Sequence, residues 1–262
     1  MNQHISTYQN KTYLIPYKHN QTNLFIYDTE SERETVQVLS APEILNFGTC
    51  ITLLPNGELF CFGKIDPYSG ISLIIDQNFD IRVLPSGTCC ACSSGIYLNN
   101  SVYCFGGEMM TAPLPLAERF DLDENRWIML NPMEEYDYYC SCVMFNGNIL
   151  ITGFENKNIW RYSVEEDSYT RISFEFADIK RKILISDISE RLYLIECGGL
   201  IFESEIEDDN AWKPIGSSLI SNVWPVQVSY AYNGRAVYFS MNSDEYRYKF
   251  DLDEKNMIKF KN

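Results

Sequence analysis

The stretch SVYCFGGEMMTAPLPLAERFDLDENRWIML, residues 101–130, decides the fold of this chain. An apolar, aromatic-rich run ends in Gly106-Gly107, a loop with prolines follows, and a second run ends at Asp121. A polar turn then leads to a short run that contains Trp127. Runs of this composition between turn signals are typical of β-strands. The stretch is either a glycine-rich phosphate loop or one unit of a repeated structure.

Turn signals elsewhere in the chain favour the repeat. Asn-Gly or a related pair separates two strand-like runs at six places, which is a strong hairpin signal. The second residues of these pairs recur every 43 to 47 positions and are Asn10, Gly57, Asn100, Gly147, Glu190 and Gly234. A fixed spacing of this size is typical of a repeat architecture.

A second series of runs keeps the same spacing and completes each unit. Apolar or aromatic runs that end near an acidic residue are each followed by a polar turn and a short strand-like run, as in residues 118–130 and 246–260. Each unit therefore predicts four short strands, and no segment predicts a long amphipathic helix. For the first unit, the inner strand has to come from residues 3–8.

Units of about 44 residues with apolar side chains on both faces of their strands need neighbours on both sides. A radial arrangement buries those faces and leaves only short sheet edges. We therefore expect a single all-β domain over residues 1–262, a six-bladed β-propeller of four-stranded antiparallel blades. The expected blades cover approximately residues 1–40, 41–84, 85–130, 131–173, 174–215 and 216–262.

The third unit resembles a kelch repeat. The residues that carry this resemblance are Tyr103, Gly106, Gly107, Phe120, Asp121 and Trp127, followed by Pro132-Met133. The other units match only in part. In the second unit Lys64 replaces the second glycine, and in the fourth unit Tyr169 stands at the tryptophan position. The resemblance implies a propeller and a protein-interaction role, since kelch proteins often serve as adaptors or scaffolds. No additional adaptor domain is predicted in this chain.

The glycine pair does not predict a phosphate loop. The run CFGGEMM lacks the glycine and lysine spacing of such loops, and no helix start follows it. A glycine pair at a strand end instead allows positive φ and close approach of a neighbouring blade. Trp127 and Trp212 are predicted to fill the wedges between blades, and Asp121 and Asp251 to accept hydrogen bonds from turn amides.

The charge of the chain limits its partners. The formal net charge is −15, which argues against nucleic acid and against anionic membrane surfaces. It favours a protein partner with a basic segment. We find no secretory signal and no apolar run long enough to span a bilayer. The odd number of cysteines, nine, fits a reducing compartment. We therefore expect a cytoplasmic monomer.

Two other functions remain open at this point. A carbohydrate-processing propeller enzyme needs a cluster of arginines and carboxylates at the channel mouth. The chain has only His4 and His19 as histidines, so we expect no histidine metal site and no Ser-His-Asp set. We expect no catalytic residue, no metal and no cofactor.

The second open alternative is a cysteine-based redox sensor or zinc site. Its candidates lie in the predicted inner strands of the third and fourth units and are Cys89, Cys90, Cys92, Cys140 and Cys142. Buried cysteine also packs as a small hydrophobe. Without basic neighbours that would lower the thiol pKa, we favour packing.

The loops between second and third strands, and those between blades, share one face of a propeller, and loops on a rigid scaffold commonly carry function. Aromatic, methionine and basic side chains in these loops are the partner-binding residues we predict. They are Tyr68, Met109, Met110, Tyr136, Tyr138, Tyr139, Lys180, Arg181 and Trp224. Lys182 extends the basic cluster of Lys180 and Arg181. We therefore predict a non-catalytic protein-interaction domain that uses this face.

Overall fold

The structure is a computed structural model in which every regular element of the described residues is a β-strand. No helix in this part of the chain is long and apolar enough to cross a membrane. The described residues are 11–14, 23–40, 47–64, 70–88, 94–109, 112–113, 116–134, 140–153, 158–172, 182–186, 191–197, 199–204, 212–219, 228–232, 236–241 and 247–260.

Five of the sheets are four-stranded and antiparallel; four of these are built from consecutive strands, and in the fifth β10 and β11 intervene between the second and third strands. One sheet comprises β4 (Phe47–Leu53), β5 (Leu59–Lys64), β6 (Gly70–Ile75) and β7 (Ile81–Leu84). The sheet after it comprises β8 (Ser94–Leu98), β9 (Ser101–Phe105), β12 (Ala117–Asp121) and β13 (Arg126–Met129). The third of these sheets comprises β14 (Ser141–Phe145), β15 (Asn148–Thr152), β16 (Ile159–Ser163) and β17 (Ser168–Ile172). The fourth comprises β18 (Lys182–Ser186), β19 (Leu192–Glu196), β20 (Leu200–Ser204) and β21 (Trp212–Ser217).

The sheet at the C-terminal end comprises β22 (Val228–Tyr232), β23 (Ala236–Met241), β24 (Arg247–Asp251) and β25 (Asn256–Phe260). The sheet at the N-terminal end has three described strands, β1 (Lys11–Leu14), β2 (Asn23–Asp28) and β3 (Arg33–Val38). A small two-stranded ribbon of β10 (Glu108–Met109) and β11 (Ala112–Pro113) lies between β9 and β12 in sequence.

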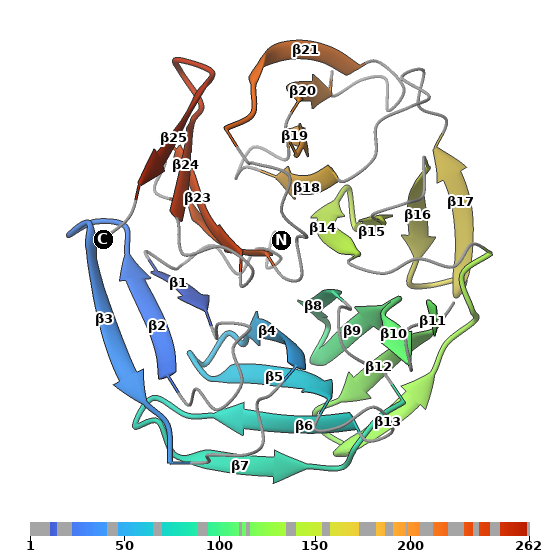
Figure 1. Cartoon of the computed structure of the whole chain (residues 1–262). Coiled ribbons are helices and arrows are strands. Elements are labelled where there is room, and N and C mark those ends of the chain that lie inside the picture. The colour runs from blue at the N-terminus through green and yellow to red at the C-terminus, as the bar shows by residue number, and fades with distance from the viewer. Residues whose placement is uncertain are drawn as a thin grey trace.

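The sheets surround a common centre, with one edge strand of each toward the centre and the other at the rim (Figure 1). β4 contacts β8, β8 contacts β14, and β14 contacts β18, so the inner strands follow one another around the centre. β1 contacts β22 and β23, which brings the first sheet against the last. This arrangement is a β-propeller with four-stranded antiparallel blades.

The predicted number of six blades is not confirmed. Five sheets have the four strands of a blade, whereas the N-terminal sheet has three strands among the described residues. The inner strand that we expected from residues 3–8 lies outside the described part of the chain.

The hairpin turns explain why the strands pair as they do. Asn99 and Asn100 both have positive φ (50° and 56°), and so do Asn146 and Gly147 (47° and 75°). Two consecutive residues of positive φ give the turn whose twist matches that of paired strands. These turns set the registers Leu98↔Ser101 and Phe145↔Asn148. The hairpin predictions at 99–100 and 146–147 are therefore confirmed.

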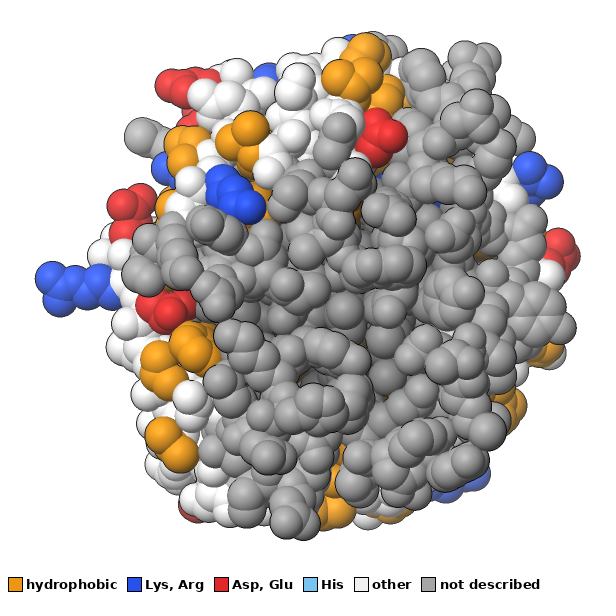
Figure 2. All heavy atoms as spheres, viewed as in Figure 1, with side chains coloured by type: hydrophobic (Ala, Val, Ile, Leu, Met, Phe, Trp, Pro, Cys, Tyr) orange, Lys and Arg blue, Asp and Glu red, His pale blue; other side chains and the backbone are white. Residues whose placement is uncertain are grey.

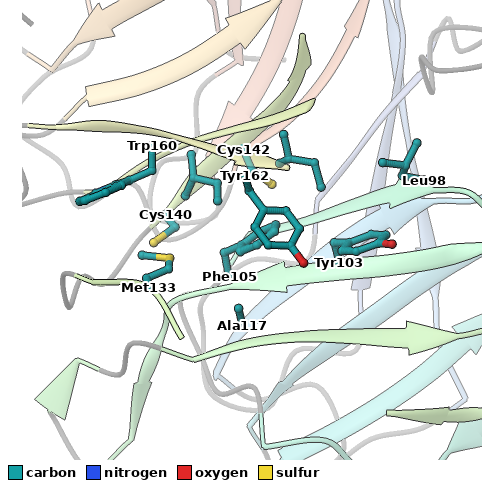
Figure 3. Packing of buried hydrophobic residues seen from close by; sticks show 11 residues of the cluster. Leu98, Tyr103, Phe105, Ala117, Met133, Cys140, Cys142, Trp160 and Tyr162 are labelled. Carbon is teal, nitrogen blue, oxygen red and sulfur yellow. The ribbon is translucent and has the colours of Figure 1, made fainter. Parts of the chain in front are cut away.

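The core consists of apolar clusters between neighbouring sheets rather than of one central cluster. Between the sheets of β9 and β16, Tyr162 packs on Phe105 and Tyr103, with ring centroids 5.3 and 6.3 Å apart (Figure 3). Trp127 joins Phe60 and Phe62 of the preceding sheet, and Trp212 packs with the sheet of β16. Each sheet therefore depends on its neighbours for burial, and both tryptophans fill wedges as predicted.

Candidate functional site

The candidate site is the face that carries the loops between second and third strands and the connections between sheets, which we call the loop face. One described part of this face is the segment that leaves β9. Gly106 and Gly107 have positive φ values of 67° and 107°, which residues other than glycine rarely adopt. The amide of Gly106 donates to the carbonyl of Leu116 at 2.8 Å, which closes the base of the loop.

Beyond this base, the loop forms the ribbon of β10 and β11. Met109 pairs with Ala112, and Glu108 pairs with Pro113. The chain therefore leaves a fully buried strand, turns at the glycine pair and forms a short antiparallel ribbon. A loop held in this way by a rigid frame is suited to recognition.

Of the predicted partner-binding residues, the structure describes the backbone of Met109 in β10. The other eight lie outside the described residues, so the structure does not test whether they lie together. They are Tyr68, Met110, Tyr136, Tyr138, Tyr139, Lys180, Arg181 and Trp224.

Lys182 does not belong to an exposed basic cluster, which corrects the expectation from the sequence. Its side chain is 1% exposed at the start of β18. Its ammonium donates to the carbonyl of Gly153 in the preceding sheet at 3.3 Å. Lys182 alternates with Ile183, so it shares a side of β18 with Leu184, which packs against that sheet. The lysine therefore connects two sheets from within the protein.

The opposite face carries the hairpin turns between third and fourth strands, and aspartates organise these turns. Asp121 accepts the amides of Asp123 and Glu124 at 3.1 and 2.9 Å. Asp251 accepts the corresponding amides of Asp253 and Glu254 at 3.0 and 2.9 Å. The predicted role of Asp121 and Asp251 as acceptors of turn amides is confirmed. These carboxylates stabilise local turns, and a catalytic role is not needed to explain them.

Glu118 is a buried carboxylate that sequence reasoning missed. It is 2% exposed in β12, and its two oxygens accept the amide of Thr88 at 3.2 and 3.0 Å. Nearby, the indole of Trp127 donates to the carbonyl of Pro85 at 2.9 Å. Both contacts fix the connection that leads from β7 toward β8. The only signal in the sequence was an acidic residue within a strand-like run.

A set of hydrogen bonds links the sheets of β13 and β16. The Tyr162 hydroxyl donates to a carboxylate oxygen of Asp167 at 2.8 Å, and Asp167 also accepts the amide of Asn131 at 3.1 Å. The Tyr169 hydroxyl donates to the carbonyl of Asn131 at 3.0 Å. Burial, followed by the Asp167 carboxylate, raises the pKa of Tyr162 above its ordinary range. The phenol therefore remains a donor that holds the connection between sheets in place.

The described arginines do not converge on a substrate site. Arg119 donates to the Ser101 hydroxyl at 3.3 Å and lies 3.7 Å from Asp121, and Arg126 pairs with Glu124 in an exposed turn. Within the described ranges, no three histidine, cysteine or acidic side chains are grouped so that they could hold a metal ion. Arg119 and Arg126 therefore have partners within their own sheet and turn.

The cysteines of the inner strands are buried thiols. Cys142 is 6% exposed, and its sulfur lies 3.1 Å from the Ser94 hydroxyl (Figure 3 shows Cys142 and Cys140 in their cluster). Burial raises the pKa of Cys142 to about 12, and burial also raises that of Cys50. A thiol with a raised pKa is protonated at neutral pH and is a poor nucleophile. Cys89, Cys90 and Cys92 lie outside the described residues.

Comparison with known families gives one match. Residues 89–134 match the Kelch motif, and this range contains the glycine pair, Asp121 and Trp127. A search of curated proteins gives no match.

Solved structures share the fold of the chain. A virginiamycin B lyase from Staphylococcus aureus is 14% identical with a TM-score of 0.64, and the match covers 96% of this chain and 80% of that one. A chain of a nidogen/laminin complex is 11% identical with a TM-score of 0.71, covering 96% of this chain and 93% of that one. At these identities the similarity shows the propeller fold alone.

Proposed function

We propose that this kelch-repeat β-propeller is a non-catalytic protein-interaction domain that binds a partner through its loop face. One observation carries the proposal: the paired strands β10 and β11, which follow a glycine pair of positive φ and a hydrogen bond that closes the base of the loop. Kelch propellers generally bind proteins, and the Kelch motif at residues 89–134 contains this ribbon. A preformed loop loses less conformational entropy on binding than a flexible one does.

The proposed contact residues are aromatic and methionine side chains of the loop face. Tyr, Trp and Met are enriched at the centres of protein interfaces, where they supply large apolar areas. The residues are Tyr68, Met109, Met110, Tyr136, Tyr138, Tyr139 and Trp224, with Lys180 and Arg181 beside them.

The charge of the chain supports a partner with a basic segment. At a net charge of −15, long-range attraction speeds association with a basic surface and disfavours nucleic acid and anionic membranes. Self-repulsion at this charge supports a monomer. The described cysteines are free thiols, which supports the cytoplasm as the compartment.

The absence of catalysis is supported by how three polar side chains at the seams are used. Glu118, Asp167 and Lys182 each bind backbone groups across a seam between sheets. A catalytic carboxylate or lysine would instead need to reach a substrate from a cleft. These three residues therefore stabilise the scaffold that presents the loops.

We also propose that the ring has six blades, with residues 3–8 as the inner strand of the N-terminal blade. The first sheet already contacts the last through β1, which leaves room in the sequence for one strand before β1. An experimental structure that shows a strand at residues 3–8 paired with β1 supports this count. A structure in which another segment pairs there contradicts it.

Affinity capture tests the function. We expect the wild-type protein to capture a specific partner, and Tyr136→Ala/Tyr138→Ala/Trp224→Ala to lose it. The matched control is Val83→Ala, an exposed change on the rim strand β7 that leaves the loop face intact. Equal capture by the triple variant and the control would show that another surface binds the partner.

A further inference from the structure

The rim strand β3 is one of the two longest outer strands and is regular, whereas β17 and β25 are also regular but have five residues each. It pairs with β2 over its full length, from Asn23↔Val38 to Asp28↔Arg33, without a register shift. β21 has the same length but contains Pro214 and a shift, whereas β7 and β13 have four residues. Proline, irregularity and shortness are devices that prevent an edge strand from pairing with another chain. β3 has none of them.

Apolar side chains are exposed on one side of β3. Val36 is 51% exposed and Val38 is 65% exposed, and alternation along a strand places them on the same side. Phe25 of β2, which pairs with Val36, continues this apolar surface as a half-buried side chain. Hydrophobic side chains are visible at the left rim in Figure 2, where Figure 1 places β2 and β3.

This side of β3 faces the last sheet. Tyr27 shares the side with Val36 by register, and its ring packs on Phe260 and Tyr238 at 5.4 and 6.0 Å. On β25, Ile258 shares the side of Phe260 and is 46% exposed. Exposed apolar side chains therefore line both walls of the outer end of the seam between the first and last sheets.

The charges near β3 indicate what kind of segment fits. The turn before β3 exposes Glu30 and Glu32, and Asp28 at its start accepts the turn amides of Glu30 and Ser31. Two lysines of the last hairpin face the other way: Lys255 pairs with Glu203 at 2.8 Å, and Lys259 lies over the Tyr248 ring. Lys249 of β24 shares the side of Ile258 by register, and its ammonium lies over the Tyr238 ring at 5.6 Å. The exposed charged side chains of the turn before β3 are thus glutamates, with Arg33 at the start of the strand and Lys11 beside Asp28 on the far side of β2. A complementary strand would carry basic residues there.

We propose that β3 accepts an extended segment of a basic partner protein as an added antiparallel strand. Apolar side chains of that segment pack over Val36 and Val38, and lysines or arginines that follow them in sequence lie beside Glu30 and Glu32. Antiparallel pairing gives this order because the C-terminal end of the added strand lies at the N-terminal end of β3. A second copy of the chain fits poorly, since each copy carries a net charge of −15 and presents glutamates where cations are needed.

This rim surface is separate from the loop face, so either proposal can fail without the other. The probe is a fluorescent peptide in which valine and threonine alternate and two lysines follow at the C-terminal end. A peptide of reversed sequence, with the lysines first, has the same composition. We expect the first peptide to bind more tightly than the second, and equal binding would overturn the proposed orientation.

The variants locate the binding surface. Val36→Lys/Val38→Lys introduces like charge on the strand and should weaken binding by about tenfold or more, a loss of about 1.4 kcal/mol. Val83→Lys, the same change at a 59% exposed valine of β7, should leave binding unchanged. Equal loss in both variants, or no loss in the double variant, overturns the proposal.

Two further measurements complete the test. Glu30→Gln/Glu32→Gln should weaken binding severalfold and reduce its dependence on salt. Sedimentation of the free protein should show a monomer. A dimer that is lost in Val36→Lys/Val38→Lys would show that a second copy covers β3, which overturns the basic partner. Thermal unfolding verifies that each variant is folded.

Discussion

Glu118 and Tyr162 show how single polar residues hold this propeller together. Glu118 accepts an amide of the connection before β8, and Tyr162 donates to Asp167, which in turn accepts an amide of the connection after β13. A buried acceptor with partners stabilises modestly, but a buried group left without partners costs more. The polar residues of the seams are therefore sensitive positions although they carry no chemistry.

Glu118→Gln should lower the free energy of unfolding by about 1 to 3 kcal/mol. The amide replaces one of the two oxygens that accept the Thr88 amide with a donor. Urea unfolding followed by tryptophan fluorescence measures the change. Glu124→Gln, in the exposed turn of the same blade, is the control and should stay within about 0.5 kcal/mol of the wild type. Equal midpoints for both variants would contradict the role of Glu118.

The raised pKa of Tyr162 predicts a decline in the stability of the protein at high pH. Burial, followed by Asp167, raises its pKa above the 10.0 of a free phenol, so the unfolded chain releases the proton at a lower pH than the folded protein. Its contribution to stability is therefore complete below about pH 10 and is lost as pH rises above that value. Tyr162→Phe should be less stable at neutral pH and should lose less stability between pH 9 and 11. The same slope in both proteins would contradict this.

At the scale of elements, the strands and their turns could be predicted because the signals are local. An Asn-Asn pair marks the β8–β9 hairpin, and an Asn-Gly pair marks the β14–β15 hairpin. Asn99 and Asn146 both have positive φ, a conformation that asparagine tolerates well. The aspartate at the end of a third strand likewise predicts its turn. Such features need no knowledge of the rest of the chain.

Contacts across seams could not be predicted in the same way. Lys182 was grouped with its basic neighbours in sequence, yet the adjacent sheet buries it against Gly153. Glu118 accepts the amide of Thr88, which precedes β8 on the connection from the previous blade. The exposure of Val36 and Val38 depends on how the first and last sheets meet. Each of these depends on the distance between segments far apart in the sequence.

The burial of the described cysteines predicts that most thiols are unreactive in the folded protein. Cys50, Cys61, Cys104, Cys140, Cys142 and Cys197 are buried and free. A thiol-reactive dye at pH 8 should therefore label at most the three remaining cysteines until the protein is unfolded, when all nine react. Mass spectrometry of labelled peptides identifies the sites. Rapid labelling of Cys142 or Cys50 in the native state would favour a redox sensor.

At the scale of the whole molecule, the structure is a ring of sheets from which connecting loops extend on one face. The apolar clusters between sheets fix the blades against one another, and the glycine base fixes the ribbon β10–β11 on its sheet. A scaffold of this kind can vary its loops without changing its core. The same separation explains why the Kelch motif identifies the propeller but does not identify the partner.

The measurement that tests the central claim most directly is the affinity of the captured partner for loop-face variants, by calorimetry. We expect Tyr136→Ala/Tyr138→Ala/Trp224→Ala to weaken binding by about 100-fold or more, since central aromatic residues often cost 2 kcal/mol or more each. Val83→Ala on the rim and Asp253→Asn on the opposite face should bind as the wild type does. Wild-type affinity in the triple variant, together with a loss in either control, would contradict binding through the loop face.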